Sequence, residues 1–554
     1  MVSIVDTIFG KPGGRRDEKI LDARAAPLGV DGPISSKAIP PDFQILEKYA
    51  LALPYAYAVI AENPVDKIPY YFIDEVQLSE REKVLYEKII TTLQVEVKAP
   101  RDETNLRQYF EDQAKRTVNR YRLMKNWGSG VSWEILLYYA ERDMVGFGPL
   151  DPLMRDPNIE DISIDSVKRP VFIYHRNYES IETNLVFADE EKLDDVIVRL
   201  VHMSGKHVST AFPIVDATLP GRHRLAATFR REVTPQGSSL TIRKFREDPI
   251  TVIDLINFRT IDYVAAAYAW LLLESRAAAI VVGATASGKT TFLNAMLSMV
   301  NPNSKIVTIE EVQEINIHHV NWEPLVSRLS YGLSEESAGE ISLFMLVKAA
   351  MRMRPDVMVV GEVRGEEAYA LFQAISTGHG GLATLHADNA PSAIQRLTSK
   401  PMDVAPAYLN FLDLIFTVRR VAIPNVVNPE SPKYVRRLIS IDELVNIDKV
   451  VSIFAWDAKR DTYEHNIEKS VKLKGLARDH GKTMNDMLQE INNRIKVLQW
   501  LVAKKIRNFI EVSTIFSQYH ADPESVLARI EKDQVSSDAS DREKGIENIA
   551  GNPA

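Results

Sequence analysis

The sequence predicts an α/β protein whose largest domain is built around parallel strands. Three short runs rich in apolar residues, at 279–282, 305–309 and 357–360, have the length and β-branched content of strands. Helix-like apolar spacing follows the first run from Thr290 to Val300, and a further helical pattern precedes the third. Strands that alternate with helices are typical of a sheet whose strands run parallel.

The length and composition are those of a multidomain globular protein. At 554 residues the chain has room for about three domains, with 45% hydrophobic and 26% charged residues. The net charge of −8 gives no global reason to expect a nucleic-acid partner. The absence of cysteine excludes disulfides, thiol catalysis and cysteine-ligated zinc, and it fits a reducing cytoplasm.

No stretch of the sequence has the character of a membrane span or a secretory signal. The most apolar stretch, residues 264–273, has about half the length that a membrane helix needs, and Glu274 and Arg276 follow it. Residues 1–9 are too few and too acidic for a secretory signal. We therefore expect any membrane association to be indirect, through a partner.

Five segments are expected along the chain. The first residues show no sustained period, the stretch GFGPLDPLMRDPNIEDISID opens an α+β pattern, and Asp248-Pro249 begins the linker into the largest domain. The expected segments are a disordered start at 1–45, an α/β accessory domain at 46–145, a small α+β domain at 146–247, the nucleotide-binding domain with its C-terminal helices at 248–525, and a polar tail at 526–554.

The first of these apolar runs leads into a phosphate-binding loop, in the stretch AAAIVVGATASGKTT. Glycines let the backbone wrap closely round a phosphate, and the following helix adds a favourable dipole. We expect Lys289 to reach the β- and γ-phosphates of ATP, and the Thr290 hydroxyl to ligate Mg²⁺. The residues expected to line the nucleotide are Gly283, Ala284, Thr285, Ala286, Ser287, Gly288, Lys289, Thr290 and Thr291.

Acidic residues follow the other two apolar runs. Glu310 and Glu311 come directly after the run at 305–309, and Glu362 ends the run that begins at residue 357. Ligands bind at the carboxyl ends of parallel strands in an open sheet. A carboxylate at this position can hold Mg²⁺ or orient the attacking water, so we expect Glu362 to be a site residue and a metal ligand.

Histidines and arginines supply further candidates. His379 and His386 flank a short strand pattern, and without a third ligand at usual spacing they fit a γ-phosphate sensor better than a metal site. The small α+β domain is rich in arginine, which is compatible with an exposed strand face or with arginine fingers that reach the γ-phosphate. The arginines in the C-terminal half of this domain are Arg222, Arg224, Arg230, Arg231, Arg243 and Arg246.

Four motifs stand in one order: GATASGKTT, TIEEVQEI, RPDVMVVGEVRG and STGHGGLATLHADN. Together with GFGPLDPLMRDPNIEDI and LTIRKF upstream, the sequence resembles the type II/type IV secretion superfamily of hexameric traffic ATPases. The resemblance is closest to the archaeal branch, which includes the archaellum motor ATPase and archaeal type IV pilus assembly ATPases. It covers roughly residues 146–519.

The resemblance implies a RecA-like P-loop ATPase domain preceded by a small α+β N-terminal domain and a further N-terminal extension, with six chains in a ring. It implies that residues 283–291 are the Walker A loop, Glu362 the Walker B glutamate, Glu310 and Glu311 the aspartate box, and His379 and His386 the histidine box. Arg222, Arg224 and Arg243 would act on a neighbouring subunit's nucleotide. The family usually reads Glu-Asp where this chain has Glu310-Glu311, so Glu310 is preferred as the water-orienting carboxylate.

The function implied by the resemblance is ATP hydrolysis that drives assembly of a type IV pilus-like filament, either a pilus or an archaellum, with rotation in the archaellar case. The expected partners are further copies in a homohexamer, a polytopic membrane platform protein and archaellum accessory proteins, but no nucleic acid. The expected location is the cytoplasm, at the inner face of the membrane. Alternatives are a protein-export ATPase of a type II-like system, a nucleic-acid-translocating RecA-like motor and a nucleotide-binding scaffold without hydrolysis.

Overall fold

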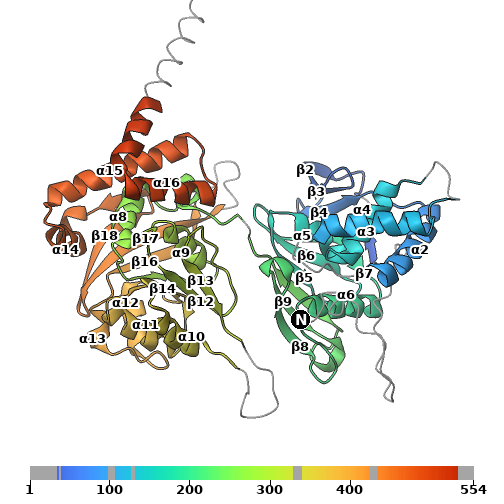
Figure 1. Ribbon diagram of the computed structural model, residues 1–554, viewed down its shortest axis with the longest axis horizontal. Coiled ribbons are helices and arrows are strands. Elements are labelled where there is room, and N and C mark those ends of the chain that lie inside the picture. The colour runs from blue at the N-terminus through green and yellow to red at the C-terminus, as the bar shows by residue number, and fades with distance from the viewer. Residues whose placement is uncertain are drawn as a thin grey trace, which may run out of the picture. The chain divides into compact units, whose positions relative to one another are not determined.

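The computed structural model describes residues 34–36, 39–97, 106–125, 131–246, 248–328, 340–423 and 433–533 (Figure 1). The chain divides into two compact units, unit 1 at residues 1–246 and unit 2 at residues 247–554. Most of the start that the sequence predicts to be disordered lies outside the described residues. Its residues 34–36 nevertheless form strand β1, which pairs with a later strand of unit 1.

Unit 1 is organised on one sheet with the strand order β2-β3-β4-β7-β6-β5-β10-β9-β8, and β1 pairs with β7 beside this path. Its pairs are antiparallel except for β4 and β7, which run parallel. The strands are β1 (Ile34–Ser36), β2 (Gln44–Ala52), β3 (Ala56–Glu62), β4 (Pro69–Glu75), β5 (Ile159–Ile164), β6 (Pro170–His175), β7 (Glu179–Phe187), β8 (Ile214–Thr218), β9 (Arg224–Thr228) and β10 (Ser239–Arg243).

The junction between β4 and β7 joins the two segments that the sequence separates at residue 145. A single backbone pair, Tyr71 with Thr183, connects the strands. The amide of Asn184 extends this connection, because its Oδ1 accepts a hydrogen bond from the Ile73 N–H at 2.8 Å and its Nδ2 donates to the Ile73 carbonyl at 3.1 Å. The strands before and after the expected domain boundary at residue 145 therefore belong to one sheet.

Helices pack on the sheet of unit 1 and form a second small core of their own. The helix after residue 79 begins with a capping box formed by Ser79 and Glu82. The helices are α2 (Glu80–Glu96), α3 (Leu106–Arg120), α4 (Trp133–Met144), α5 (Asp151–Arg155) and α6 (Glu190–Met203), with short 3₁₀ turns η1 (Gly148–Leu150), η2 (Pro220–Arg222) and η3 (Arg230–Glu232).

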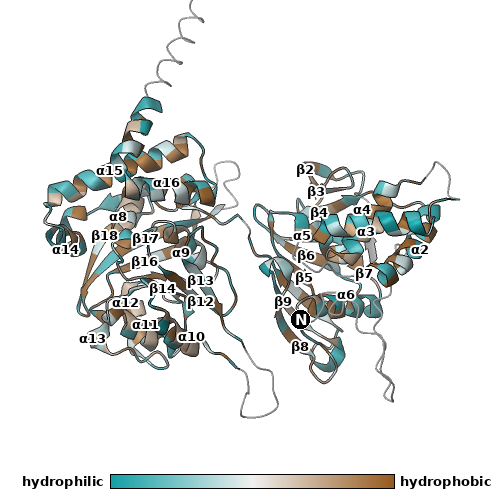
Figure 2. Cartoon of the chain, viewed as in Figure 1, coloured by the Kyte–Doolittle hydropathy of each residue, from teal (hydrophilic) through white to brown (hydrophobic). Residues whose placement is uncertain are grey.

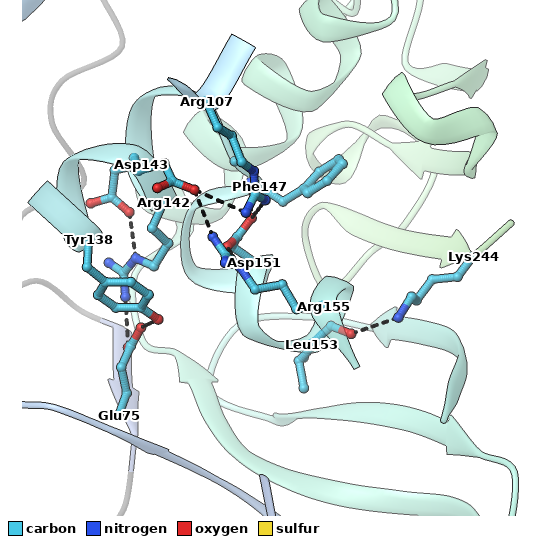
Figure 3. Close-up of polar contacts among 12 residues, drawn as sticks. Glu75, Arg107, Tyr138, Arg142, Asp143, Phe147, Asp151, Leu153, Arg155 and Lys244 are labelled. Atoms are coloured by element: carbon cyan, nitrogen blue, oxygen red, sulfur yellow. Dashed lines mark hydrogen bonds and ion pairs between the residues drawn. The ribbon is translucent and has the colours of Figure 1, made fainter. Parts of the chain in front are cut away.

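A network of buried charges ties α4 to the end of β4 (Figure 3). The Arg142 side chain is 10% exposed and donates to Glu75 at 2.9 Å and to Asp143 at 2.8 Å. Tyr138 also donates to Glu75, at 2.6 Å. Arg155 donates to Asp151 at 2.5 Å and to Glu141 of α4 at 3.2 Å, so the start of the α+β segment is held to the same group of elements.

Unit 2 contains a second sheet with the order β13-β12-β14-β15-β11-β16-β17-β18-β19. The strands from β13 to β16 in this order run parallel, and those from β16 to β19 run antiparallel. They are β11 (Ala279–Val282), β12 (Ile306–Glu310), β13 (Trp322–Val326), β14 (Val357–Val363), β15 (Gly380–Leu385), β16 (Leu414–Ile423), β17 (Lys433–Asn446), β18 (Lys449–Asp457) and β19 (Thr462–His465).

Helices cover both faces of this sheet. Alternate residues of a strand point to opposite faces, so each strand packs against both groups of helices. On β11, Ala279 and Val281 pack with α7 (Val252–Asn257), α8 (Tyr263–Glu274), α9 (Lys289–Leu297), α14 (Val471–Asp479), α15 (Met484–Ala503) and α16 (Phe509–Ala521). Ile280 and Val282 pack with α10 (Leu343–Ala350), α11 (Glu367–Ser376), α12 (Ala390–Thr398) and α13 (Pro406–Leu409). The 3₁₀ turns are η4 (Met351–Met353) and η5 (Ile467–Lys469).

Hydropathy follows this layering, since β14 is hydrophobic and α15 carries hydrophobic and hydrophilic residues along its length (Figure 2).

The predicted polar tail begins too early. Residues 523–533 are helical, and Val526 and Ile530 are buried in the same core as α16 because their four-residue spacing places them on one helix face. The α/β class is confirmed. Among the described residues, no helix combines the length and apolarity that crossing a bilayer requires.

Replacing Arg142 with alanine is expected to destabilise unit 1 by about 3–5 kcal/mol, because it leaves the Glu75 and Asp143 carboxylates without their buried cation. Urea denaturation of the full chain measures this change. The matched control is Arg231→Ala, whose side chain is 70% exposed and pairs with Glu190, and whose loss should cost no more than about 1 kcal/mol. Equal effects of the two substitutions would contradict the role given to the buried network.

Candidate functional site

The parallel strands of unit 2 bring the predicted site residues to one edge of the sheet. Val282, the last residue of β11, pairs with Leu385, the last residue of β15. The neighbouring strands β12 and β14 also run parallel to these two, with Ile309 opposite Val360. The carboxyl ends of the four strands therefore meet at one edge, where open α/β sheets bind their ligands.

The loop at residues 283–288 follows β11 at this edge and depends on both of its glycines. Gly288 has φ +91°, and Ala286 also has a positive φ of +60°. A Cβ atom on Gly283 would lie 2.3 Å from the carbonyl oxygen of Val418. Gly288 precedes α9, whose first turn has no side-chain cap. Its N–H groups are thus available to an anion at the positive end of the helix.

Lys289 begins α9 and turns back over the loop. The residue is 8% exposed, and its Nζ donates to the carbonyl oxygen of Ala284 at 3.1 Å. The same Nζ lies 3.4 Å from Nδ1 of His386, which follows β15. Burial lowers the pKa of Lys289, and the nearby Glu362 carboxylate acts in the opposite direction. The phosphate loop, β14 and the end of β15 therefore meet at this lysine.

His386 connects Lys289 with Glu362. Its Nε2 lies 2.8 Å from Oε1 of Glu362, and burial followed by the charge of Lys289 lowers its pKa. A neutral ring can accept from the lysine at Nδ1. Its Nε2 is close to Glu362 but not in hydrogen-bond geometry, so the buried Oε1 of Glu362 has no hydrogen-bond partner among the described residues. Arg396 donates to the His386 carbonyl oxygen at 2.8 Å and so fixes the histidine backbone.

The two adjacent acids after β12 lie in different surroundings. Glu310 is buried, and its Oε1 accepts hydrogen bonds from the N–H groups of Glu314 and Ile315, both at 2.9 Å. Glu311 lies 3.6 Å from Arg364, whose guanidinium also contacts Glu362. Neighbouring residues of extended chain point in opposite directions, so only one of the two can turn toward this arginine. The structure thus brings Glu311 into the group around Glu362, whereas the sequence favours Glu310.

His379 lies at the other end of β15 from His386. The strand between them, Gly380–Leu385, separates the two histidines by roughly 20 Å at about 3.3 Å per residue. Nδ1 of His379 lies 3.0 Å from the carbonyl oxygen of Ala374, at the end of α11. The sequence led us to expect both histidines at the γ-phosphate. One chain cannot bring both of them to the same γ-phosphate, so this expectation is wrong for a single chain.

The predicted arginines of unit 1 gather at one end of β9 and β10. Arg224 and Arg243 are directly opposite each other in the ladder. Each also pairs with a carboxylate, Arg224 with Asp216 at 2.6 Å and Arg243 with Asp161 at 3.0 Å. Arg222 instead lies over the Phe245 ring, 5.4 Å from its centroid, and has no ion pair within the described ranges. Their approach to a nucleotide remains a prediction.

Arginines that the sequence analysis did not select also lie at the phosphate loop. Arg419 and Arg420 stand on β16, and Arg436 stands on β17. Arg419 donates to the carbonyl oxygen of Asp388 at 2.8 Å, beyond the end of β15. The only signal in the sequence is the arginine pair in each of the strand patterns VRRVAI and YVRRLI. A basic pair on a strand does not reveal which loop that strand will adjoin.

The residues at this edge fit a nucleoside triphosphate with Mg²⁺. The glycine loop and the uncapped start of α9 suit phosphate oxygens, and Thr290 lies in the first turn of α9. Among the described residues, no group of three or more acidic, histidine or cysteine side chains could hold a metal alone. Mg²⁺ typically binds through one or two protein oxygens together with substrate phosphates, and Thr290 and Glu362 can supply those oxygens.

Comparison with known proteins identifies relatives that include this region. A family model described as "Type II/IV secretion system protein" matches residues 143–421. An uncharacterized protein of Methanocaldococcus jannaschii is 37% identical over 398 residues, which are 69% of each chain. A second from that organism is 36% identical over 275 residues, 48% of this chain and 98% of its own. Type IV secretion system protein PtlH of Bordetella pertussis is 34% identical over 212 residues, 34% of this chain and 60% of its own.

The histidine between Arg222 and Arg224 provides a pH test of this part of unit 1. His223 is 9% exposed, its Nδ1 accepts from the Phe245 N–H at 2.9 Å, and burial lowers its pKa from 6.5 to about 4. Between these two values the unfolded chain binds a proton that the folded chain does not. The stability from His223 is therefore complete above about pH 6.5 and is lost as the pH falls toward about 4.

Urea denaturation from pH 4.5 to 7.5 is expected to show a smaller pH dependence for His223→Gln than for the unsubstituted chain. His480→Gln, at an exposed position, should leave the dependence unchanged. If the unsubstituted chain and His223→Gln lost stability equally as the pH fell, the buried histidine would not be the proton-linked group.

Proposed function

This chain belongs to the type II/IV secretion system protein family, and on that premise we propose that it is an Mg²⁺-dependent ATP hydrolase that drives assembly of a type IV pilus-like filament. The family resemblance that the sequence predicts is confirmed, and its archaeal branch fits the Methanocaldococcus jannaschii relatives. The observation that carries the proposed hydrolysis is the contact series from Lys289 through His386 to Glu362 beside the phosphate loop.

In the proposed reaction, the loop at 283–288 and Lys289 hold the β- and γ-phosphates. Mg²⁺, held by Thr290 and Glu362 together with phosphate oxygens, would supply positive charge for the transition state. The oxygen of a water molecule bonds to the γ-phosphorus as the bond to the β–γ bridging oxygen breaks. Glu362 orients this water and accepts the proton that the water loses, and Arg364 keeps Glu311 beside it.

His386 is proposed to couple the phosphate end of the site to the water end. Its ring contacts both groups, with Nδ1 3.4 Å from Nζ of Lys289 and Nε2 2.8 Å from Oε1 of Glu362. A change at the γ-phosphate that moves Lys289 would therefore also move the His386 ring that lies against Glu362. His379 has no such place within one chain, because β15 separates it from the phosphate loop.

The mechanical part of the proposal requires charges from another subunit of a homohexamer. Arg222, Arg224 and Arg243 are the proposed donors, and Arg222 is favoured because no carboxylate competes for it within the described ranges. Arg224 and Arg243 would first have to leave Asp216 and Asp161. Closure of the smaller domain on ATP and its release after hydrolysis would then act on a membrane platform protein, which would hold the ring at the inner face of the membrane.

Protein export is the second candidate function, and the Bordetella pertussis relative favours it because that protein is named as a type IV secretion component. The proposed hydrolysis is common to both functions. They differ in what the movement delivers, which is filament subunits in the first case and secreted protein in the second. The archaellar form of the first would add rotation and archaellum accessory proteins.

Replacing Glu362 with glutamine is expected to reduce phosphate release at least about 100-fold while ADP binding stays within a few-fold, because the amide cannot accept a proton from the attacking water. A phosphate-release assay and ADP titration by calorimetry measure the two effects. Glu366→Gln is the matched control, since this exposed acid lies just beyond β14 and should leave turnover unchanged. Undiminished phosphate release from Glu362→Gln would reject its role.

A chromosomal Lys289→Ala substitution is expected to abolish surface filaments while the secreted proteins remain unchanged. Electron microscopy of cells and analysis of the culture medium measure these two outcomes. Loss of secreted protein with filaments intact would favour the export function. Strong stimulation of the purified ATPase by single-stranded DNA would instead favour a nucleic-acid motor, for which the net charge of −8 gives no support.

A further inference from the structure

Strands β16 and β17 continue beyond the sheet edge at which the phosphate loop lies. The pairing of β11 with β16 ends at Val282 and Thr417. β16 then continues as a two-stranded ribbon with β17, from the pair Val418 with Leu438 to the pair Ile423 with Lys433. We call residues 418–423 and 433–438 the arginine ribbon. It stands directly beside residues 283–288, because Gly283 is in close contact with the Val418 carbonyl oxygen.

Arg436 of the arginine ribbon lies over the last glycine of the phosphate loop. A Cβ atom on Gly288 would lie 3.0 Å from Cδ of Arg436 and 3.4 Å from its Nε. Arg436 is exposed and forms no ion pair with any residue of the described ranges. A flexible cation thus reaches the turn from which α9 begins, on the opposite side of the loop from the β14 and β15 side chains.

Arg420 is directly opposite Arg436 in the ladder, and its guanidinium lies 4.6 Å from the centroid of the Tyr434 ring. Residues directly opposite each other in a ladder point to the same face, so both guanidinium groups belong to one face of the ribbon. The loop beside this face has the geometry for phosphate. The Tyr434 ring holds Arg420 toward the same face as Arg436.

Opposite charges therefore lie on the two sides of the phosphate loop. In the strand order β12-β14-β15-β11-β16-β17, the carboxylates Glu311 and Glu362 follow β12 and lie on β14, and Arg420 and Arg436 stand on β16 and β17. Mg²⁺ and the γ-phosphate belong on the carboxylate side. The α-phosphate and the nucleoside then extend toward the arginine ribbon.

We propose that Arg436, supported by Arg420, binds the α-phosphate end of the nucleotide held by the same chain. This inference rests on the proposed function, because it requires a nucleotide in the loop. ADP and ATP share this end, so Arg436 contributes equally to the binding of both. It takes no part in distinguishing ATP from ADP, which belongs to Lys289, Glu362 and the arginines of unit 1.

The test compares full-length Arg436→Ala with the unsubstituted chain in calorimetric titrations with ADP and with AMP-PNP, each with Mg²⁺. The dissociation constants of both nucleotides should rise by the same factor, about 10- to 100-fold, as expected for losing hydrogen bonds to a charged group. Arg436→Lys should recover part of the affinity, because it keeps the charge but not the planar donor geometry.

The matched control is Arg460→Ala, at an arginine that is 82% exposed in the turn between β18 and β19, and it should change neither affinity. Unchanged ADP affinity in Arg436→Ala would overturn the inference, as would weaker binding of AMP-PNP alone. Melting curves verify folding, and Arg436→Gln replaces the alanine variant if that variant melts early. If the unsubstituted chain bound neither nucleotide, the proposed function itself would fail.

Discussion

The parallel pairing of β12, β14, β15 and β11 is the constraint on which the candidate site depends. Strands that run the same way must end at the same edge, so each must return through a helix on one face or the other. The residues that follow these strands then meet without any local attraction between them. Hydrophobic burial of the strand interiors positions the Lys289, His386 and Glu362 side chains at the edge.

The same constraint explains why the polar residues of the edge perform different tasks. Glu310 still belongs to β12 and is drawn under the next turn, where backbone N–H groups use its carboxylate. Glu311 is the first residue beyond the strand and turns toward Arg364. His386 is also the first residue beyond its strand, and it lies between a cation and a carboxylate with its pKa lowered by burial. A displacement of one residue along a strand thus separates a structural acid from one available to a ligand.

The phosphate loop could be predicted from the sequence because its chemistry is contiguous, from Gly283 to Thr290. Glu362 could be predicted because a buried strand leads directly into it. The separation of His379 from His386 also follows from the length of the strand between them, which the sequence analysis did not consider. Arg436 could not be predicted, since it reaches the loop only through the register of β16 with β11 and β17. The junction within the sheet of unit 1 could not be predicted. It includes hydrogen bonds between the Asn184 side-chain amide and the backbone of Ile73, and no local sequence pattern indicates such a contact.

The charge contrast across the carboxyl edge bears on the order in which products would leave. After cleavage, orthophosphate would lie beside Glu311 and Glu362, where like charges repel it, whereas ADP would remain next to Arg420 and Arg436. Departure of orthophosphate would then come first, and the diphosphate would occupy the subunit until its slower escape. A subunit in such a ring would spend most of each cycle loaded with spent nucleotide, and whatever loosens the arginine ribbon would set the pace of the whole assembly.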